Sequence, residues 1–281
     1  MLDLTIAIPV KNEAKNLPAC LEAIGPDLAK EVIVIDSGST DGTQEIAQEI
    51  GVPILSFDWD GKFPKKRNWF LRNHTPSTKW ILFLDADEFL TPEFKNELRT
   101  TLPNSDKVGY WLNYSIYFNG KPLRGGYPLK KLALFRVGSG KYERIDEDHW
   151  SKLDMEIHEH PILQGEIGYI RSRIDHRDLR GPEAWAKKHE EYALWEAKRY
   201  LANIANPEIR NQWTLFQKIK YWLMGTPLIS PAFFFGCFVL MGGFLDGRRG
   251  LKWACMKAGY FAQVYARIQQ EKANIKTGHG S

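Results

Sequence analysis

The chain has 281 residues, of which 43% are hydrophobic and 13% aromatic, so it can hold one large α/β domain and a smaller appendage. Its formal net charge is +4, and the positive excess lies in residues 207–281, which hold ten Lys and Arg against three Asp and Glu. The cysteines at positions 20, 237 and 255 are odd in number and far apart. This spacing argues against a disulfide framework or a cysteine metal site and favours a reducing compartment.

The residue pattern of the first 51 residues predicts a βαβ unit followed by a helix. Apolar residues 4–10 predict a strand that begins almost at Met1, which argues against a signal peptide, and a helix is expected over about 14–24. A second strand, 32–35, ends on Asp36, and the next helix is expected to start from a cap within residues 39–41 and to end at Gly51. The chain has no GxGxxG and no GxxxxGK[ST] here, which argues against a dinucleotide Rossmann site and against a P-loop.

Asp36 stands at the end of a predicted parallel strand, in the run VIDSGSTDGT. Open α/β sheets bind their ligands at the carboxyl ends of strands. Asp36 is therefore a candidate to accept hydrogen bonds from a base or a ribose. The alternative is an acid that only organises the turn or caps the helix.

Residues 81–84 predict a strand that is buried on both faces, and this strand ends on Asp85 and Asp87 with Ala86 between them. Two carboxylates at one strand tip repel each other unless a cation lies beside them. Hard oxygen ligands of this kind suit Mg²⁺ or Mn²⁺, which bind through one or two carboxylates and substrate phosphates. A DxD run by itself also occurs as a pair of solvated loop acids.

Four motifs together resemble the GT-A fold glycosyltransferases of family 2. They are IPVKNEAKNL, VIDSGSTDGT, KKRNW at 65–69, and LDADE, in this order over about the first hundred residues. The resemblance implies an α/β fold, with a GT-A (Rossmann-like), mostly parallel sheet flanked by helices. It also implies an inverting transferase that uses a nucleotide-diphosphate sugar, expected to be UDP-linked.

The resemblance also implies site residues. Pro9 and Glu13 would line the base pocket, Asp36 would hold the base or ribose, and Arg67 would lie near the nucleotide. Asp87 would ligate the metal, with Asp85 nearby. The nucleotide-binding residues expected on this ground are Pro9, Glu13, Asp36, Ser37, Gly38, Arg67, Asp85 and Ala86.

The middle of the chain is expected to carry the acceptor side, with strands over 108–119 and 129–136. Inverting transfer needs a base that takes the proton of the acceptor hydroxyl. Glu159 is assigned this role because its HEH run resembles the equivalent segment of lipopolysaccharide-core glucosyltransferase-like members. By the same resemblance His176 helps to hold the diphosphate or metal, with His158 as the competing candidate. For both histidines the alternative is a packed or solvated side chain.

Residues 1–180 are expected to form the GT-A domain, with a nucleotide-sugar half over 1–105 and an acceptor half over 106–180. Residues 181–281 would form a C-terminal helical, membrane-associating appendage. Its segment 227–245 is uncharged and rich in Phe, but its prolines and glycines make one continuous helix improbable. Basic residues on both sides favour an element that lies in the membrane plane or re-enters it. The alternative is a buried hairpin.

This tail also resembles that of membrane-associated family 2 enzymes. We therefore expect a peripheral or monotopic protein on the cytoplasmic side of a membrane, with an anionic membrane surface as partner. The acceptor would be a lipid-linked or membrane-embedded glycan in cell-envelope or exopolysaccharide synthesis. Nucleic acid is not expected, because the basic excess adjoins an apolar segment. Other functions left open are a sugar-1-phosphate nucleotidyltransferase and a non-catalytic membrane-surface scaffold with a GT-A fold.

Overall fold

The chain divides into two compact units in the computed structural model, which describes residues 1–145, 147, 150–151, 153–156 and 160–277. The first unit comprises residues 1–117 and 128–179, and the second comprises 118–127 and 180–281. The short segment 118–127 thus belongs with the C-terminal helices, which the sequence pattern did not indicate.

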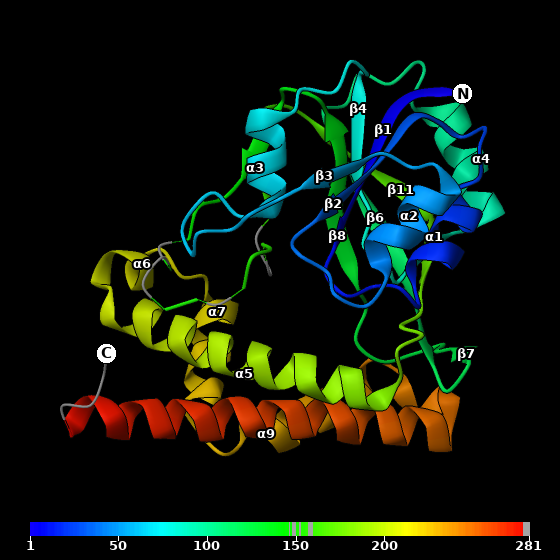
Figure 1. Cartoon of the computed structure of the whole chain (residues 1–281). Coiled ribbons are helices and arrows are strands. Elements are labelled where there is room, and N and C mark those ends of the chain that lie inside the picture. Colours follow the sequence, from blue (N-terminus) through cyan, green and yellow to red (C-terminus); the bar gives the residue numbers. More distant parts are fainter. Residues whose placement is uncertain (146, 148–149, 152, 157–159, 278–281) are drawn as a thin grey trace. The chain divides into compact units, whose positions relative to one another are not determined.

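A mixed sheet forms the centre of the first unit (Figure 1). Its strand order is β3-β2-β1-β4-β8-β6-β11-β5. Strands β1, β2, β3 and β4 run parallel to one another, and β6 is parallel to β11. Strand β8 is antiparallel to β4 and β6, and β5 is antiparallel to β11. The strands are β1 (Leu2–Val10), β2 (Ala29–Asp36), β3 (Ile54–Ser56), β4 (Trp80–Phe83), β5 (Glu88–Leu90), β6 (Gly109–Phe118), β8 (Lys130–Arg136) and β11 (Ile167–His176).

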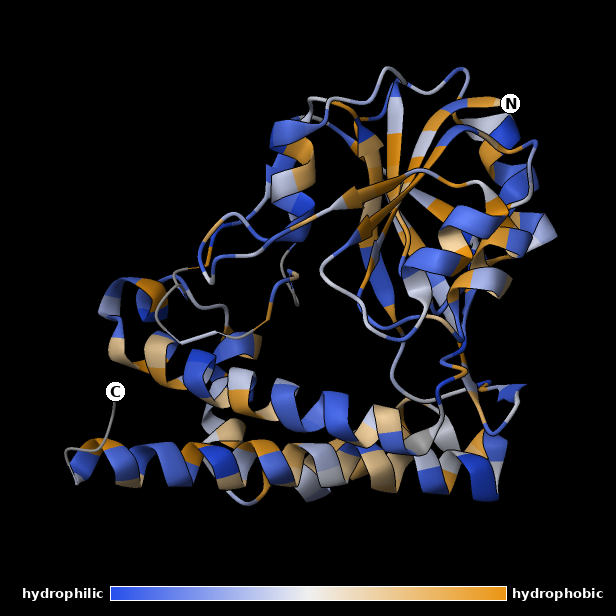
Figure 2. Ribbon diagram, in the orientation of Figure 1, coloured by the Kyte–Doolittle hydropathy of each residue, from blue (hydrophilic) through white to orange (hydrophobic). Residues whose placement is uncertain are grey.

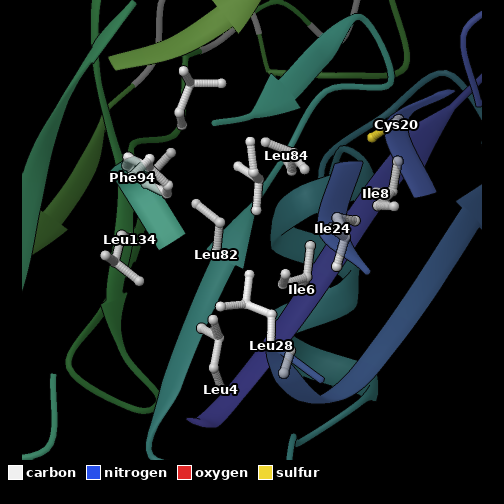
Figure 3. Packing of buried hydrophobic residues seen from close by; sticks show 14 of the residues in the cluster. Leu4, Ile6, Ile8, Cys20, Ile24, Leu28, Leu82, Leu84, Phe94 and Leu134 are labelled. Carbon is white, nitrogen blue, oxygen red and sulfur yellow. The ribbon is translucent and has the colours of Figure 1, made fainter. Parts of the chain in front are cut away.

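Both faces of this sheet are covered, which is why its strands are apolar almost throughout. Helices α1 (Leu17–Ile24), α2 (Thr43–Ile50) and α4 (Pro92–Thr101) pack on one face, and α3 (Lys66–Asn73) packs on the other (Figure 1). Alternate residues of β1 therefore enter two different cores: Ile6 packs with the first group of helices, and Ala7 packs on the side of α3. Figure 3 shows the larger core.

The predicted helices and strands of the first unit are confirmed, with small changes at their ends. Gly51 ends α2 in the left-handed conformation, with φ of 82°, as predicted. The start of α2 differs, because its N-cap residue is Gly42, which has no side chain to cap the helix. The carboxylate of Asp41 instead accepts the backbone N–H of Thr43, which is already inside the helix. Outside the main sheet, β9 (Gly140–Tyr142) pairs with β10 (Pro161–Leu163).

The second unit is built on two long helices, α5 (Pro182–Ala205) and α9 (Arg248–Lys276), which lie side by side in the same direction. His189 of α5 contacts Tyr260 of α9. Further along both helices, Lys272 lies over the ring of Tyr200. Buried alanines on α5 let the helices approach closely, and each helix alternates apolar and polar bands along its length (Figure 2).

The remaining helices of the second unit are short. They are α6 (Pro207–Asn211), α7 (Leu215–Met224) and α8 (Ile229–Phe235), and the segment 118–127 contributes the short strand β7 (Lys121–Pro122). This segment is held to the unit by Asp246, whose Oδ2 accepts the backbone N–H groups of Arg124 and Gly125 over 2.8 and 3.0 Å.

The apolar segment 227–245 is broken, as its prolines and glycines predicted. After α8 the chain makes a π-helical turn, Gly236–Leu240, and then a 3₁₀ turn, Gly243–Asp246. A Cβ on Gly250 would lie 1.8 Å from the carbonyl oxygen of Gly243, so glycine is needed where α9 begins against this turn. Among the residues described, we find no helix long and apolar enough to cross a bilayer.

Candidate active site

The loops that follow β1 and β2 are joined into one structure at the carboxyl edge of the sheet. The strand ends are neighbours, because Val10 pairs with Asp36. The N–H of Asn12 donates to Ser39 Oγ over 2.8 Å, and Asn12 Oδ1 accepts the N–H of Thr40 over 2.8 Å. Asn12 has a φ of 57°, a left-handed conformation that asparagine tolerates well.

Asp36 is fully buried, and its carboxylate organises the turn that follows β2. It accepts the N–H groups of Gly38 and Ser39, both over 3.0 Å, and the side-chain amide of Gln44. These contacts correspond to the turn-organising alternative, and its role with a base or ribose stays a prediction. Ser37 is half-buried beside it, whereas Gly38 is exposed.

Pro9 and Glu13 lie on either side of the end of β1. Pro9 is buried within the strand, opposite Ile35. Glu13 is half-buried; its N–H donates to Thr43 Oγ1 over 2.9 Å, and its carboxylate accepts the side-chain amide of Asn16 over 2.7 Å. Glu13 therefore belongs to the same joined pair of loops as Asp36.

The N-terminal turn of α3 reaches this edge from the other face of the sheet. Lys66 Nζ donates to the carbonyl oxygen of Val10 over 2.8 Å. Arg67 Nη2 lies 2.7 Å from Asp85 Oδ1. The KKRNW motif thus connects the end of β1 to the acidic turn after β4. Burial lowers the pKa of the Lys66 ammonium, although Asp154 beside it acts in the opposite direction.

Acidic residues after β9 cap this same helix terminus. The two carboxylate oxygens of Glu156 accept the N–H groups of Arg67 and Asn68, each over 2.9 Å, and its carbonyl oxygen accepts Arg67 Nη1 over 2.8 Å. Glu147 pairs with Lys65. A carboxylate is favourable there because the first N–H groups of a helix lack partners within the helix. Sequence reasoning missed Glu156, because nothing local relates it to α3.

The turn after β4 carries a third acid that the DxD motif does not include. Asp85 pairs with Arg67 and, through Oδ2, with Lys131 Nζ over 2.6 Å. Lys131 also pairs with Glu88, which is buried. Burial raises the pKa of Glu88 to about 7, while Lys131 acts to lower it. Sequence reasoning missed Lys131 and Glu88, and the available signal was a lysine directly before the buried apolar run 132–135 of β8.

Asp87 faces a different partner. Its Oδ2 lies 3.7 Å from His176 Nε2 at the end of β11, where His176 pairs with Glu88 across the strands. Ala86, between the two aspartates, is buried. The structure thus brings together three of the predicted residues, Asp87, His176 and Asp85, but the described contacts of Asp85 are with cationic side chains.

The chemistry of these donors suits a divalent cation that arrives with a phosphate ligand. In the described part of the chain, no group of three or more His, Cys, Asp and Glu residues is arranged to hold a metal ion. Asp87 and His176 form a pair, and Mg²⁺ and Mn²⁺ commonly bind through one or two protein ligands plus phosphate oxygens. Glu159 and His158 lie outside the described residues.

A comparison with protein families identifies the chain. The family model described as glycosyl transferase family 2 matches residues 5–153, more than half of the chain. The chain belongs to glycosyl transferase family 2. The matched range includes the joined loops, α3 and the DxD turn, and the central sheet with its flanking helices is the GT-A architecture expected for this family.

Two relatives show how far the similarity extends. This family 2 protein is 26% identical to a lipopolysaccharide core biosynthesis glycosyltransferase, LpsC, of Rhizobium meliloti, over 95% of this chain and 93% of that protein. It is 38% identical over 110 residues to a TPR repeat-containing protein of Synechococcus elongatus, which covers 39% of this chain and 27% of that protein. The second similarity therefore concerns one part of a much longer protein.

Two solved structures that align with this chain have lower sequence identity to it than these two relatives. The family 2 chain aligns with residues 1–349 of S. aureus TarS at 13% identity and a TM-score of 0.44, over 96% of this chain and 92% of that one. It also aligns with glucosyl-3-phosphoglycerate synthase from Mycobacterium tuberculosis, solved with Mn²⁺ and UDP, at 22% identity and a TM-score of 0.33, over 41% of this chain and 44% of that one.

Proposed function

We propose that this family 2 glycosyltransferase is an inverting, metal-dependent enzyme. It transfers a sugar from a nucleotide-diphosphate donor, UDP-linked in our proposal, to a hydroxyl of a lipid-linked or membrane-embedded glycan in cell-envelope or exopolysaccharide synthesis. The observation that carries the proposal is the Asp87–His176 pair at the carboxyl edge of the sheet, beside the buried contact of Arg67 with Asp85.

The reaction is a single displacement. The acceptor oxygen attacks the anomeric carbon on the face opposite the diphosphate, the bond from that carbon to the diphosphate oxygen breaks, and the nucleoside diphosphate leaves with the bonding electrons. Glu159 takes the proton of the acceptor hydroxyl, which is the role that a carboxylate within hydrogen-bond reach performs well. Inversion follows because bond formation and bond breaking occur on opposite faces.

Asp87 and His176 would hold Mg²⁺ or Mn²⁺, with His158 as the competing histidine. The bound cation supplies positive charge that stabilises the departing diphosphate. Pro9, Glu13 and Asp36, with Ser37 and Gly38, would receive the nucleoside beside the joined loops. Arg67 would lie on the other side of the nucleotide, next to Asp85 and Ala86.

We also propose that the second unit binds the cytoplasmic side of a membrane with an anionic surface, as a peripheral or monotopic element. Support comes from large apolar side chains that are exposed on α7 and on the broken apolar segment; among them are Leu215, Phe216, Trp222, Leu240, Phe244 and Leu245. A buried hairpin would instead cover such side chains. Apolar burial at the interface supplies affinity.

Basic residues adjoin this apolar surface. Helix α7 contains Lys218 and Lys220 and no acid, and Arg248 and Lys252 follow the apolar segment, all of them exposed. Each Lys or Arg near anionic lipid contributes about 1 kcal/mol to binding. A protein held at a membrane in this way meets lipid-linked acceptors at high local concentration, which is why we propose that class of acceptor.

The experiment that tests the proposed function is a donor screen with purified protein, Mn²⁺ and a membrane extract, read by mass spectrometry of the released nucleotide. We expect release of a nucleoside diphosphate and a rise in melting temperature with UDP and Mn²⁺ together. Release of pyrophosphate from a sugar-1-phosphate and a nucleoside triphosphate would identify a nucleotidyltransferase instead. A scaffold would show neither turnover nor a nucleotide-dependent shift.

A further inference from the structure

The turn after β4 concentrates negative charge. Asp85, Asp87 and Glu88 fall within four consecutive residues, and Asp87 and Glu88 are buried. Carboxylates this close disfavour one another's ionised form unless cations lie among them. Arg67 and Lys131 pair with acids of this turn, and His176 lies beside Asp87.

Lys131 has the more central place of the two. Its Nζ lies 2.6 Å from Asp85 Oδ2 and also pairs with Glu88 Oε1, so that one ammonium bridges the first and the last acid of the turn. The turn is closed by backbone contacts as well, because the N–H of Asp85 donates to Glu88 Oε2 over 3.1 Å and the N–H of Glu88 donates to the carbonyl oxygen of Asp85 over 2.9 Å. The ammonium also lies over the ring of Tyr114 at 5.4 Å.

We propose that Lys131 is a positioning residue of the donor site: it neutralises Asp85 and Glu88, so that Asp87, paired with His176, is the acid that meets the cation of the donor complex. This inference rests on the proposed function. Two acids balanced by Lys131 and Arg67 leave one carboxylate, that of Asp87, whose charge has no basic partner at comparable distance in the contacts described.

This charge balance has a functional consequence. A divalent cation that meets one carboxylate and one histidine gains most of its remaining ligands from the diphosphate. The protein would therefore bind the cation weakly alone and firmly with the nucleotide. Lys131 would thus couple cation binding to donor binding, without touching the reacting atoms.

The discriminating variant is Lys131→Met, which keeps an unbranched side chain of similar size and removes its charge. Asp85, Asp87 and Glu88 would then form an acidic cluster with less compensation. We expect affinity for Mn²⁺ in the absence of nucleotide to rise about tenfold, because a nearby positive charge has been removed. We expect the KM for the donor to rise about tenfold as Asp85 loses its fixed position, with a smaller change in kcat. A role in packing alone would not raise the affinity for a cation.

Matched variants complete the experiment. Lys130 is the exposed neighbour in β8, and its side chain points to the opposite face of the strand, so Lys130→Met should leave Mn²⁺ affinity and donor KM unchanged. Lys131→Arg retains the charge, so its Mn²⁺ affinity and donor KM should stay near those of the wild type. The double variant Glu88→Gln with Lys131→Met removes both members of one pair and should bind Mn²⁺ alone less tightly than Lys131→Met.

Mn²⁺ titrations followed by electron paramagnetic resonance, with and without UDP, read cation binding directly and need no turnover. Wild-type protein that binds Mn²⁺ with UDP, together with a Lys131→Met variant of unchanged Mn²⁺ affinity and donor KM, would overturn this inference and leave the proposed function standing. Wild-type protein that binds neither ligand would overturn the proposed function itself. If Lys131→Met does not fold, recovery of folding in the double variant supports charge neutralisation, and failure of the double variant overturns it.

Discussion

His176 Nε2 lies 3.7 Å from Asp87 Oδ2, which joins the end of β11 to the turn that follows β4. These residues come from opposite halves of the first unit, and the antiparallel pairing of β11 with β5 brings them together. The contact places an imidazole nitrogen, a common metal ligand in proteins, beside a carboxylate of the acidic turn.

Removing the carboxylate charge of this pair should abolish donor binding. We expect Asp87→Asn to lose nearly all transfer and nearly all binding of UDP with Mn²⁺, because the cation then lacks its charged ligand. The melting temperature without ligands should change little, since Asp87 pairs only with His176 among the side-chain contacts described. Titration calorimetry with UDP and Mn²⁺ measures the loss. Wild-type turnover that persists in excess EDTA would contradict a metal-dependent reaction.

The proposed base gives a different kinetic signature. Glu159→Gln should bind UDP and Mn²⁺ as the wild type does and lose about a hundredfold or more in kcat, which is the usual scale for loss of a general base. Single-turnover rates with saturating donor separate this effect from binding. Near-normal turnover in this variant would place the base at another acid, with Asp146, Glu147 and Asp148 the next to test.

The cap of α3 should contribute to stability. Glu156→Gln removes the negative charge that accepts two N–H groups at the start of the helix, and we expect the free energy of unfolding to fall by about 1–2 kcal/mol. The matched control is Glu93→Gln, because Glu93 is an exposed acid in the first turn of α4. This substitution should change the free energy of unfolding by at most a few tenths of a kcal/mol. Urea denaturation midpoints compare the two. Equal small effects would mean that Glu156 adds nothing beyond an ordinary helix-end charge.

Membrane binding should depend on the exposed face of α7. Phe216→Glu with Trp222→Glu replaces two side chains that are 77% and 62% exposed, so folding should be unaffected. We expect the wild type to co-sediment with anionic liposomes, less so at high salt, and the double variant to stay largely in solution. Tyr169→Glu is the control, because Tyr169 is 65% exposed in the first unit. Wild-type protein that does not co-sediment with liposomes would favour a purely intramolecular role for the apolar segment.

Lys257 should give the second unit a measurable pH dependence. Burial lowers the pKa of its ammonium to about 8, from an ordinary value of 10.5, where it lies over the rings of Trp185 and Trp253. Between pH 8 and 10.5 the unfolded chain binds more protons than the folded chain at this site, so the stability contribution of Lys257 rises with pH. Lys257→Met should raise the melting temperature at pH 7 and reduce the wild-type gain in stability over that interval. Parallel pH profiles of the two proteins would contradict this.

Much of the first unit followed from local pattern. Apolar runs of four residues that end on Asp36 and Asp85 predicted buried strands with polar tips, because only a sheet covered on both faces has continuous apolar strands. Gly51 and the broken segment 227–245 were predicted correctly for a similar reason: glycine and proline act on the backbone at their own positions.

The sequence alone determined the fold class, the family motifs and the strand tips that carry the acids, since each depends on neighbours in the chain. Only the tertiary structure decided which charges meet. Lys131 joins Asp85 and Glu88 because β8 lies beside β4, Glu156 caps α3 because a distant segment returns to it, and 118–127 joins the second unit through Asp246. The physical reason is that ion pairs and caps select partners by distance in space, which sequence periodicity does not encode.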